Sequence, residues 1–162
     1  MHFDGDEVSA ERFINKQTVK GSLRRQYEDS MQFLRNNLRH LPLESGFNAQ
    51  TRLEMDERAL GELLVNALVH RDYYIQSSVK VFVFRNRLEI ISPGKLPNSL
   101  TVEKIRHGLS VHRNPVLNSI CRRVLPYSGY GSGIRRALQL QPELVLEDDR
   151  DKEEFRCLIP RQ

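Results

Sequence analysis

Hydrophobic residues follow a helical repeat in some parts of the chain and a two-residue repeat in others. Residues 22–41 place an apolar side chain at every third or fourth position, which predicts an amphipathic helix that Pro42 ends. Residues 57–69 predict a second helix, and Asp56 is a suitable N-cap for it. The alternation in 78–92 predicts a β-hairpin that turns around Asn86.

The second half of the chain mixes short helices with strands. Thr101 precedes one predicted helix, and Asn114 is the expected N-cap of another that begins at Pro115. A glycine-rich stretch, "SGYGSG", leads into a further helix at 134–140, and two strands form a terminal hairpin within 142–160. Adjacent strands are thus joined by hairpins. We therefore expect an α+β fold with a mixed, mostly antiparallel sheet and helices packed on one face.

The length of 162 residues fits one domain with one core. We expect that domain to span residues 1–162, with an extended lead-in at 1–20, a helix at 22–41, a motif-bearing core at 56–140 and the terminal hairpin at 142–160.

Composition narrows the class of protein. No apolar run approaches the roughly 20 residues that span a bilayer, and the acidic N-terminus lacks the apolar core of a signal peptide. Cys121 and Cys157 have no metal-ligand spacing, which is typical of reduced thiols. We therefore expect a cytoplasmic protein without a membrane partner. The net charge of +4 permits nucleic-acid contact without requiring it, because the arginine pairs are scattered.

A line of polar residues runs along the otherwise apolar helix at 57–69. Glu62, Asn66 and His70 lie one helical turn apart, and Val65 and Val69 lie on the same side. Burying a carboxylate without a partner costs several kcal/mol, so something should compensate Glu62.

Two interpretations of this line remain open. In the first, Glu62 pairs with an arginine, for which Arg58 or Arg71 are candidates, and Asn66 bonds to a neighbouring loop. In the second, the helix lines a ligand cleft. Asn66 would then offer a neutral oxygen to a metal ion, and Glu62 would act as a base toward water.

Glycines occur at two further places where a ligand could approach the backbone. Gly94, in "IISPGKLP", follows a strand and predicts a sharp turn that a ligand can approach closely. Gly129, Gly131 and Gly133 alternate before a helix, where backbone N–H groups and the helix N-terminus favour an anion. The alternative is a flexible glycine-rich cap. No G-x-x-x-x-G-K-[ST] pattern occurs, which excludes a P-loop.

Together, E-x-x-x-N-A-x-x-H, "SPGKLP", a variable loop and G-x-G-x-G-I resemble the Bergerat (GHKL) ATP-binding fold of gyrase, heat-shock chaperone, histidine kinase and mismatch-repair ATPases. More closely, "ALGELLVNALVHRDY", "LEIISPGKLP", "HRNPVL" and "GSGIRR" resemble a bacterial RecG-related family, labelled ATP-dependent DNA helicase or transcriptional regulator. The resemblance is clearest over residues 56–140.

The resemblance implies roles for particular residues. Glu62 would be catalytic, orienting or deprotonating the attacking water. Asn66 would bind Mg²⁺, which bridges the phosphates of ATP. Gly94 would lie under the base, and Arg113 is the candidate cation for a phosphate, in a lid that covers residues 98–128. The phosphates themselves would be wrapped by the glycine loop of Gly129, Gly131 and Gly133.

One departure concerns the base. The family's D-x-G-x-G aspartate, which accepts the adenine amino group, corresponds here to Ile91 or Ser92, and Lys95 stands where a second glycine is expected. A self-sufficient helicase is excluded as well, because a translocating motor needs two P-loop lobes.

The resemblance therefore leaves two functions open. One is Mg²⁺-dependent nucleotide binding with slow ATP hydrolysis. The other is a non-catalytic Bergerat scaffold that serves dimerisation and regulation. The resemblance also implies a longer parent protein, in which other domains contact DNA.

Overall fold

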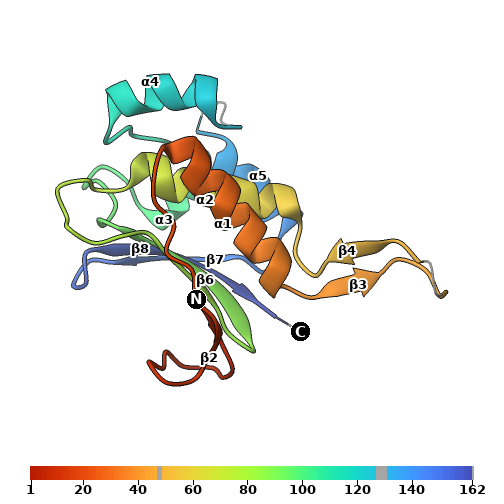
Figure 1. Cartoon of the computed structure of the whole chain (residues 1–162). Helices are drawn as coiled ribbons and strands as arrows, with labels where there is room; N and C mark the ends of the chain where they lie inside the picture. Colours follow the sequence, from red (N-terminus) through yellow and green to blue (C-terminus); the bar gives the residue numbers. More distant parts are fainter. Residues whose placement is uncertain (47–48, 127–130, 162) are drawn as a thin grey trace.

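The computed structural model describes residues 1–46, 49–126 and 131–161. They form an α+β fold in which helices cover one face of a six-stranded sheet (Figure 1). The strand order is β2-β1-β5-β6-β8-β7. The strands are β1 (His2–Phe3), β2 (Phe13–Asn15), β5 (Lys80–Val83), β6 (Arg87–Pro93), β7 (Val145–Asp149) and β8 (Glu154–Pro160). β1 pairs with β5 in parallel and the other described pairs of this sheet are antiparallel, which confirms the predicted fold class.

The helices are α1 (Leu23–Asn37), α2 (Glu57–His70), α3 (Val102–Arg106), α4 (Pro115–Val124) and α5 (Gly133–Leu140). A separate hairpin of β3 (His40–Pro42) and β4 (Thr51–Leu53) projects from the body of the molecule (Figure 1). None of the helices in the described part of the chain is both long and apolar enough to cross a membrane.

The first helix is shorter than the predicted range of 22–41. It ends at Asn37, and the next residue, Leu38, is extended and donates its N–H to the carbonyl of Leu34. Leu41, which continued the helical spacing, instead pairs with Arg52 across the β3–β4 hairpin. The prediction that the helix reaches residue 41 is therefore wrong, because its apolar spacing continues by coincidence into a strand.

The central element is α2, which packs against β6, α1 and α5. The Asp56 carboxylate accepts hydrogen bonds from the N–H groups of Arg58 and Ala59, so the predicted N-cap is present. Only a helix that is apolar on most of its surface can be covered on so many sides. Its buried residues are Ala59, Leu60, Gly61, Leu63, Leu64, Val65, Ala67, Leu68 and Val69.

Alternation along β6 decides which side chains face the helices. Leu88 and Ile90 belong to the main core, whereas Glu89, between them, contacts Arg87 and Arg156 on the opposite face. Successive side chains of a strand point to opposite faces. Ser92, two residues after Ile90, therefore faces the helices.

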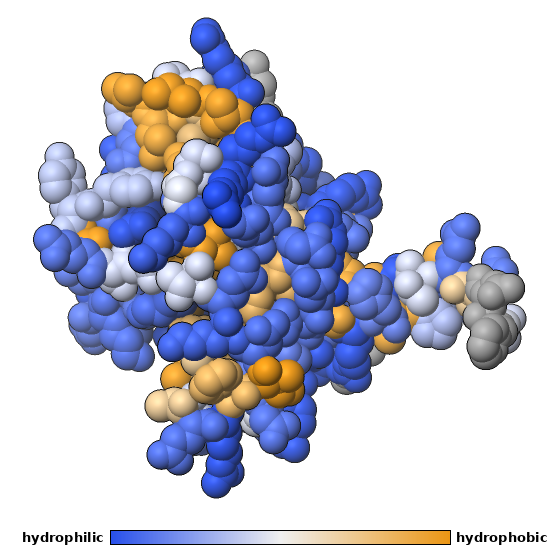
Figure 2. Space-filling view, viewed as in Figure 1, coloured by the Kyte–Doolittle hydropathy of each residue, from blue (hydrophilic) through white to orange (hydrophobic). Residues whose placement is uncertain are grey.

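Helix α4 is attached to this core by one side only. Cys121 packs against α2, whereas Val116, Ile120 and Val124 are exposed at intervals of four residues. These residues coincide with the hydrophobic patch that Figure 2 shows over α4, at the top of the molecule. The segment expected to form the lid therefore includes an amphipathic helix, α4, whose inner face packs against α2.

The central position of α2 makes a quantitative prediction. Leu60 is fully buried, and Leu60→Ala should lower the free energy of unfolding by about 2–5 kcal/mol because it leaves a cavity. Leu43, which is 53% exposed beside β3, provides the control. Leu43→Ala should change the free energy of unfolding by less than about 0.5 kcal/mol. Urea titration measures both, and equal losses would show that α2 does not form the core.

Candidate functional site

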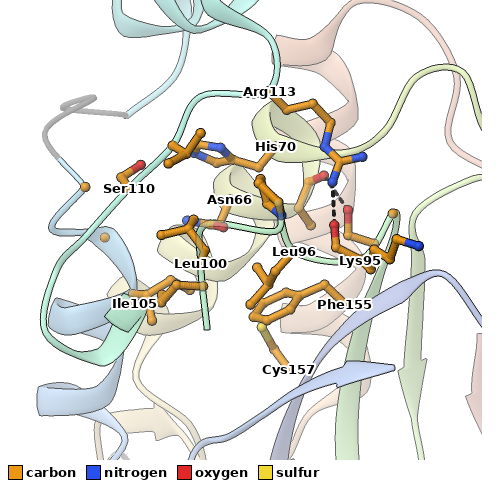
Figure 3. Close-up of a pocket in the computed structure, with 18 of the residues that line it drawn as sticks. Asn66, His70, Lys95, Leu96, Leu100, Ile105, Ser110, Arg113, Phe155 and Cys157 are labelled. Atoms are coloured by element: carbon orange, nitrogen blue, oxygen red, sulfur yellow. Dashed lines mark hydrogen bonds between the residues drawn. The ribbon is translucent and has the colours of Figure 1, made fainter. Parts of the chain in front are cut away.

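A cavity of about 70 Å³ lies between α2, the helix-facing side of β6 and β8, and the segment that leads from α3 to α4 (Figure 3). Its apolar lining includes Leu63, Ile90, Leu96, Leu100, Ile105 and Phe155. Small-molecule sites typically have roughly 300–1,000 Å³, so a ligand of nucleotide size would require the covering segment to move outward.

The polar line on α2 divides between this cavity and a second space. Asn66 and His70 line the cavity. Glu62, one turn earlier, is instead found among the described residues of a groove between α1, α2 and α5. Its Oε1 accepts a hydrogen bond from Arg136 Nε at 2.7 Å. Glu62 and Asn66 therefore do not face the same space.

The expectation of an ion pair for Glu62 is correct, but the expected partners are not. Arg58 binds Asp56, its neighbour at the N-cap. The cation that compensates Glu62 is Arg136 of α5, whose Nη1 also donates a hydrogen bond to Ser132 Oγ at 2.5 Å. Since 74 positions separate Glu62 from Arg136, spacing within one helix gave no signal for this pair.

Two of the three alternating glycines border the cavity. Gly131 and Gly133 line the cavity, and Gly129 lies outside the described residues. Gly131 has φ +72°, and a Cβ there would come within 2.8 Å of Ser110 Cβ in the lid. A Cβ on Gly133 would lie 2.6 Å from Glu62 Oε2. Close protein contacts and its positive φ therefore require glycine at position 131, whereas at position 133 a Cβ would require the Glu62 carboxylate to shift.

Helix α5 begins at this loop. Its N-cap, Ser132, makes no side-chain capping bond to the first turn. The first N–H groups of a helix lack partners within the helix and carry a partial positive charge. The beginning of α5 can therefore interact favourably with an anion in the cavity.

Arg113 and Gly94 are close together at one end of the cavity. Gly94 has φ +101°, and a Cβ there would lie 2.6 Å from Asp72 Cβ and 2.8 Å from Arg113 Nη1. Arg113 donates hydrogen bonds to the Asp72 carboxylate and to the backbone carbonyl of Lys95. In Figure 3 this group lies across the cavity from Ser110, which contacts the glycine loop. Arg113 is therefore placed away from the predicted phosphate end.

The sequence left open whether Ile91 or Ser92 faces the pocket, and in the structure it is Ser92. Its hydroxyl donates to the carbonyl of Ala67 at 3.1 Å and borders the cavity. Ile91 lies on the opposite face of the sheet, in register with Lys80 and Arg156. Of these two residues, Ser92 is therefore the one that faces the cavity.

Asn114 has a role that its sequence position did not indicate. It occupies the N-cap position of α4 but makes no side-chain capping bond there. Its Nδ2 donates instead to the carbonyls of Val69 at 3.0 Å and Arg71 at 2.8 Å, at the end of α2. The expected capping bond is thus absent, and Asn114 fastens the lid to α2.

His70 is held next to the lid by a second histidine. Its ring is stacked on that of His112, with centroids 5.7 Å apart. Burial, followed by the nearby His112 and Arg113, lowers the pKa of His70 to about 4. His70 is therefore a neutral imidazole at pH 7.

Comparison with known proteins finds a family that part of the chain resembles. Residues 76–153 match the family model described as "Putative ATP-dependent DNA helicase recG C-terminal". This part of the chain is therefore similar to the RecG-related, ATPase-like domain that the sequence motifs resemble. The match begins after α2, so it does not include Glu62 or Asn66.

A solved structure shows the fold over almost the whole chain. The DIP2311 protein from Corynebacterium diphtheriae superimposes with a TM-score of 0.81 and 20% sequence identity, covering 98% of this chain. The chain spans 33% of the length of that protein. No curated protein matches the chain.

The environment of His70 predicts a pH dependence of stability. The pKa of an unfolded histidine is 6.5, whereas in the fold it is about 4. The unfolded chain therefore takes up the proton first, and stability falls as the pH drops from 6.5 toward 4. Between pH 7.5 and 5 the loss due to His70 should be on the order of 2 kcal/mol.

Urea titrations at both pH values measure this loss, and His70→Gln is the comparison. The variant should lose less stability on acidification than the wild type, because it lacks the proton uptake of His70. It should still lose some stability, because the other titrating groups remain. Identical pH profiles for the two proteins would contradict the assignment.

Proposed function

We propose that the cavity binds the Mg²⁺ complex of a purine nucleoside triphosphate, with ATP as the nucleotide that the family resemblance implies. The observation that carries the proposal is the convergence of Asn66, Ser92 and the backbone of Gly131 and Gly133 on one cavity between α2 and the sheet. The cavity lining among the described residues contains the cations of Lys95 and Arg113 but no aspartate or glutamate. An anionic ligand suits this lining.

The phosphates would lie at the glycine end of the cavity. There the uncapped first turn of α5 and the backbone of the glycine loop offer N–H groups. Opening of the lid would expose this end, because Ser110 currently lies over Gly131. The base would occupy the other end, beside Ser92.

The residues present fit Mg²⁺ that is held mainly by the nucleotide. Within the described residues there is no group of three or more His, Cys, Asp or Glu side chains that could hold a metal by themselves. Mg²⁺ usually keeps several waters and is bound by one or two protein oxygens together with substrate phosphates. Asn66 supplies such an oxygen, and the ion would neutralise phosphate charge.

Hydrolysis would be slow in this arrangement. A general base must reach the proton that it abstracts, directly or through one water. Glu62 is bound to Arg136, and Gly133 lies between it and the cavity. We propose that nucleotide is bound much faster than it is turned over, and that turnover requires this ion pair to open.

The same ion pair favours a second candidate function. If Glu62 serves only to hold α5, the domain is a non-catalytic Bergerat scaffold for dimerisation and regulation. DNA would then be contacted by other domains of a longer parent protein.

Isothermal titration with Mg·ATP and Mg·GTP, up to millimolar concentration, tests nucleotide binding. We expect saturable heat with a stoichiometry of one. The absence of saturable heat with either nucleotide would contradict the first candidate and leave the scaffold.

Asn66→Ala tests the metal ligand. The wild type should bind nucleotide more tightly with Mg²⁺ than with EDTA, and this variant should show a smaller difference, because it lacks the protein oxygen for the ion. Asn118→Ala in α4 is the control, since Asn118 is buried away from the cavity lining. An Mg²⁺ effect in Asn66→Ala as large as in the wild type would show that Asn66 is not the ligand.

Glu62→Gln separates the two candidate functions. If Glu62 is the base, the variant should retain nucleotide binding and lose the slow release of phosphate that the wild type shows. Arg136→Gln should increase that release, because Glu62 is no longer held in the ion pair. Phosphate release below detection in the wild type and in Arg136→Gln would favour the scaffold.

A further inference from the structure

We propose that Arg113 is a specificity-determining residue that reads the base, and that the cavity prefers a 6-oxopurine to adenine. This inference rests on the proposed function, because it concerns the base of the same nucleotide. It exchanges the hydrogen-bond role of the protein group that contacts the base, from acceptor to donor. Where the Bergerat resemblance implies a carboxylate that accepts the adenine amino group, this chain presents a hydrogen-bond donor.

Arg113 is fixed before any ligand arrives. Its guanidinium donates to the Asp72 carboxylate and to the Lys95 carbonyl, and its side chain is only 23% exposed. The adjacent Asn114 fastens the same segment to the end of α2 through the carbonyls of Val69 and Arg71. Since a guanidinium has five N–H donors in a planar fork, these two bonds leave others for a ligand.

The acceptors nearest to Arg113 already have hydrogen-bond partners within the protein. Asp72 Oδ2 accepts from Arg113 and Asp72 Oδ1 accepts from the N–H of Tyr74 at 2.9 Å, and Asp72 is not among the described residues that line the cavity. The Lys95 carbonyl is bound by Arg113 as well. Ser92 does line the cavity, and its oxygen can accept a hydrogen bond because its hydrogen is directed to Ala67.

Donors, in contrast, remain available. The guanidinium of Arg113 and the ammonium of Lys95 both belong to residues that line the cavity. The Lys95 ammonium is 3.7 Å from Glu153 and its side chain is 42% exposed, so it can turn toward a ligand. The base end therefore offers mainly positively charged donors.

This arrangement distinguishes the two kinds of purine. Adenine carries an amino group at position 6, which is a donor, whereas guanine and hypoxanthine carry a carbonyl oxygen there. An amino group facing Arg113 would leave two donors unpaired, and an unpaired buried polar group costs about 1–3 kcal/mol. Arginine is also the most common partner of guanine O6 and N7 in nucleic-acid recognition. Ser92 can then accept from the N1–H of the 6-oxopurine.

Titration of the wild-type chain with the Mg²⁺ complexes of ATP, GTP and ITP tests the inference without any substitution. We expect GTP and ITP to bind about tenfold more tightly than ATP, because an arginine–base contact contributes about 1–3 kcal/mol of discrimination. ITP lacks the 2-amino group, so similar binding of GTP and ITP assigns the preference to position 6.

The role of Arg113 itself is tested with Arg113→Lys, which keeps the charge but loses the planar fork, and with Arg113→Gln. Both should reduce the ratio of ATP to GTP dissociation constants from about 10 toward 1. Arg123→Gln is the matched control, because Arg123 is exposed on α4, and it should leave the ratio unchanged. Thermal melting of each variant shows whether it is folded.

The outcomes separate this inference from the proposed function. If no triphosphate binds, the proposed function fails and the base preference fails with it. If ATP binds as tightly as GTP and ITP or more tightly, the preference is overturned while nucleotide binding stands. An unchanged ratio in folded Arg113→Lys and Arg113→Gln would remove Arg113 from base recognition. If both variants are unfolded, the wild-type titration still decides the preference.

Discussion

The burial of α2 between the sheet and the other helices is the constraint on which the rest of the structure depends. A helix covered on most sides cannot leave a carboxylate, an amide or terminal carbonyls without partners. Glu62 is compensated by Arg136 of α5, and the carbonyls at the end of α2 are bound by Asn114. Asn66 is directed to the cavity. The polar groups of this one helix thus determine where α5, the lid and the cavity lie.

These attachments also define the resting state of the site. Ser110 covers Gly131, and Arg113 joins the end of the lid to Asp72, so the cavity is small and largely covered. The Glu62–Arg136 pair keeps the candidate base away from the cavity. The proposed nucleotide would therefore have to supply the free energy that displaces the covering segment.

The sequence predicted the elements whose signals are local. Asp56 as an N-cap, the alternation of the hairpin strands and the glycines before α5 identify features that a few neighbouring residues determine. The β3 strand was missed because Leu41 continues a helical spacing. The partners of Glu62 and Asn114 were missed as well, since each contact joins residues more than 40 positions apart. Such contacts depend on how elements pack, and a single sequence records no trace of them.

The central claim is that a nucleotide enters the cavity lined by Asn66 and the glycine loop, rather than the groove where Glu62 lies. Mapping amide chemical shifts in a ¹⁵N-labelled chain during titration with Mg·ATP and Mg·GTP tests it most directly. The account predicts the largest changes at Asn66, Ser92, Ser110 and Gly133, with smaller changes at Tyr27 in the α1–α2–α5 groove. Changes confined to that groove, or none at the cavity residues under saturating nucleotide, would contradict it.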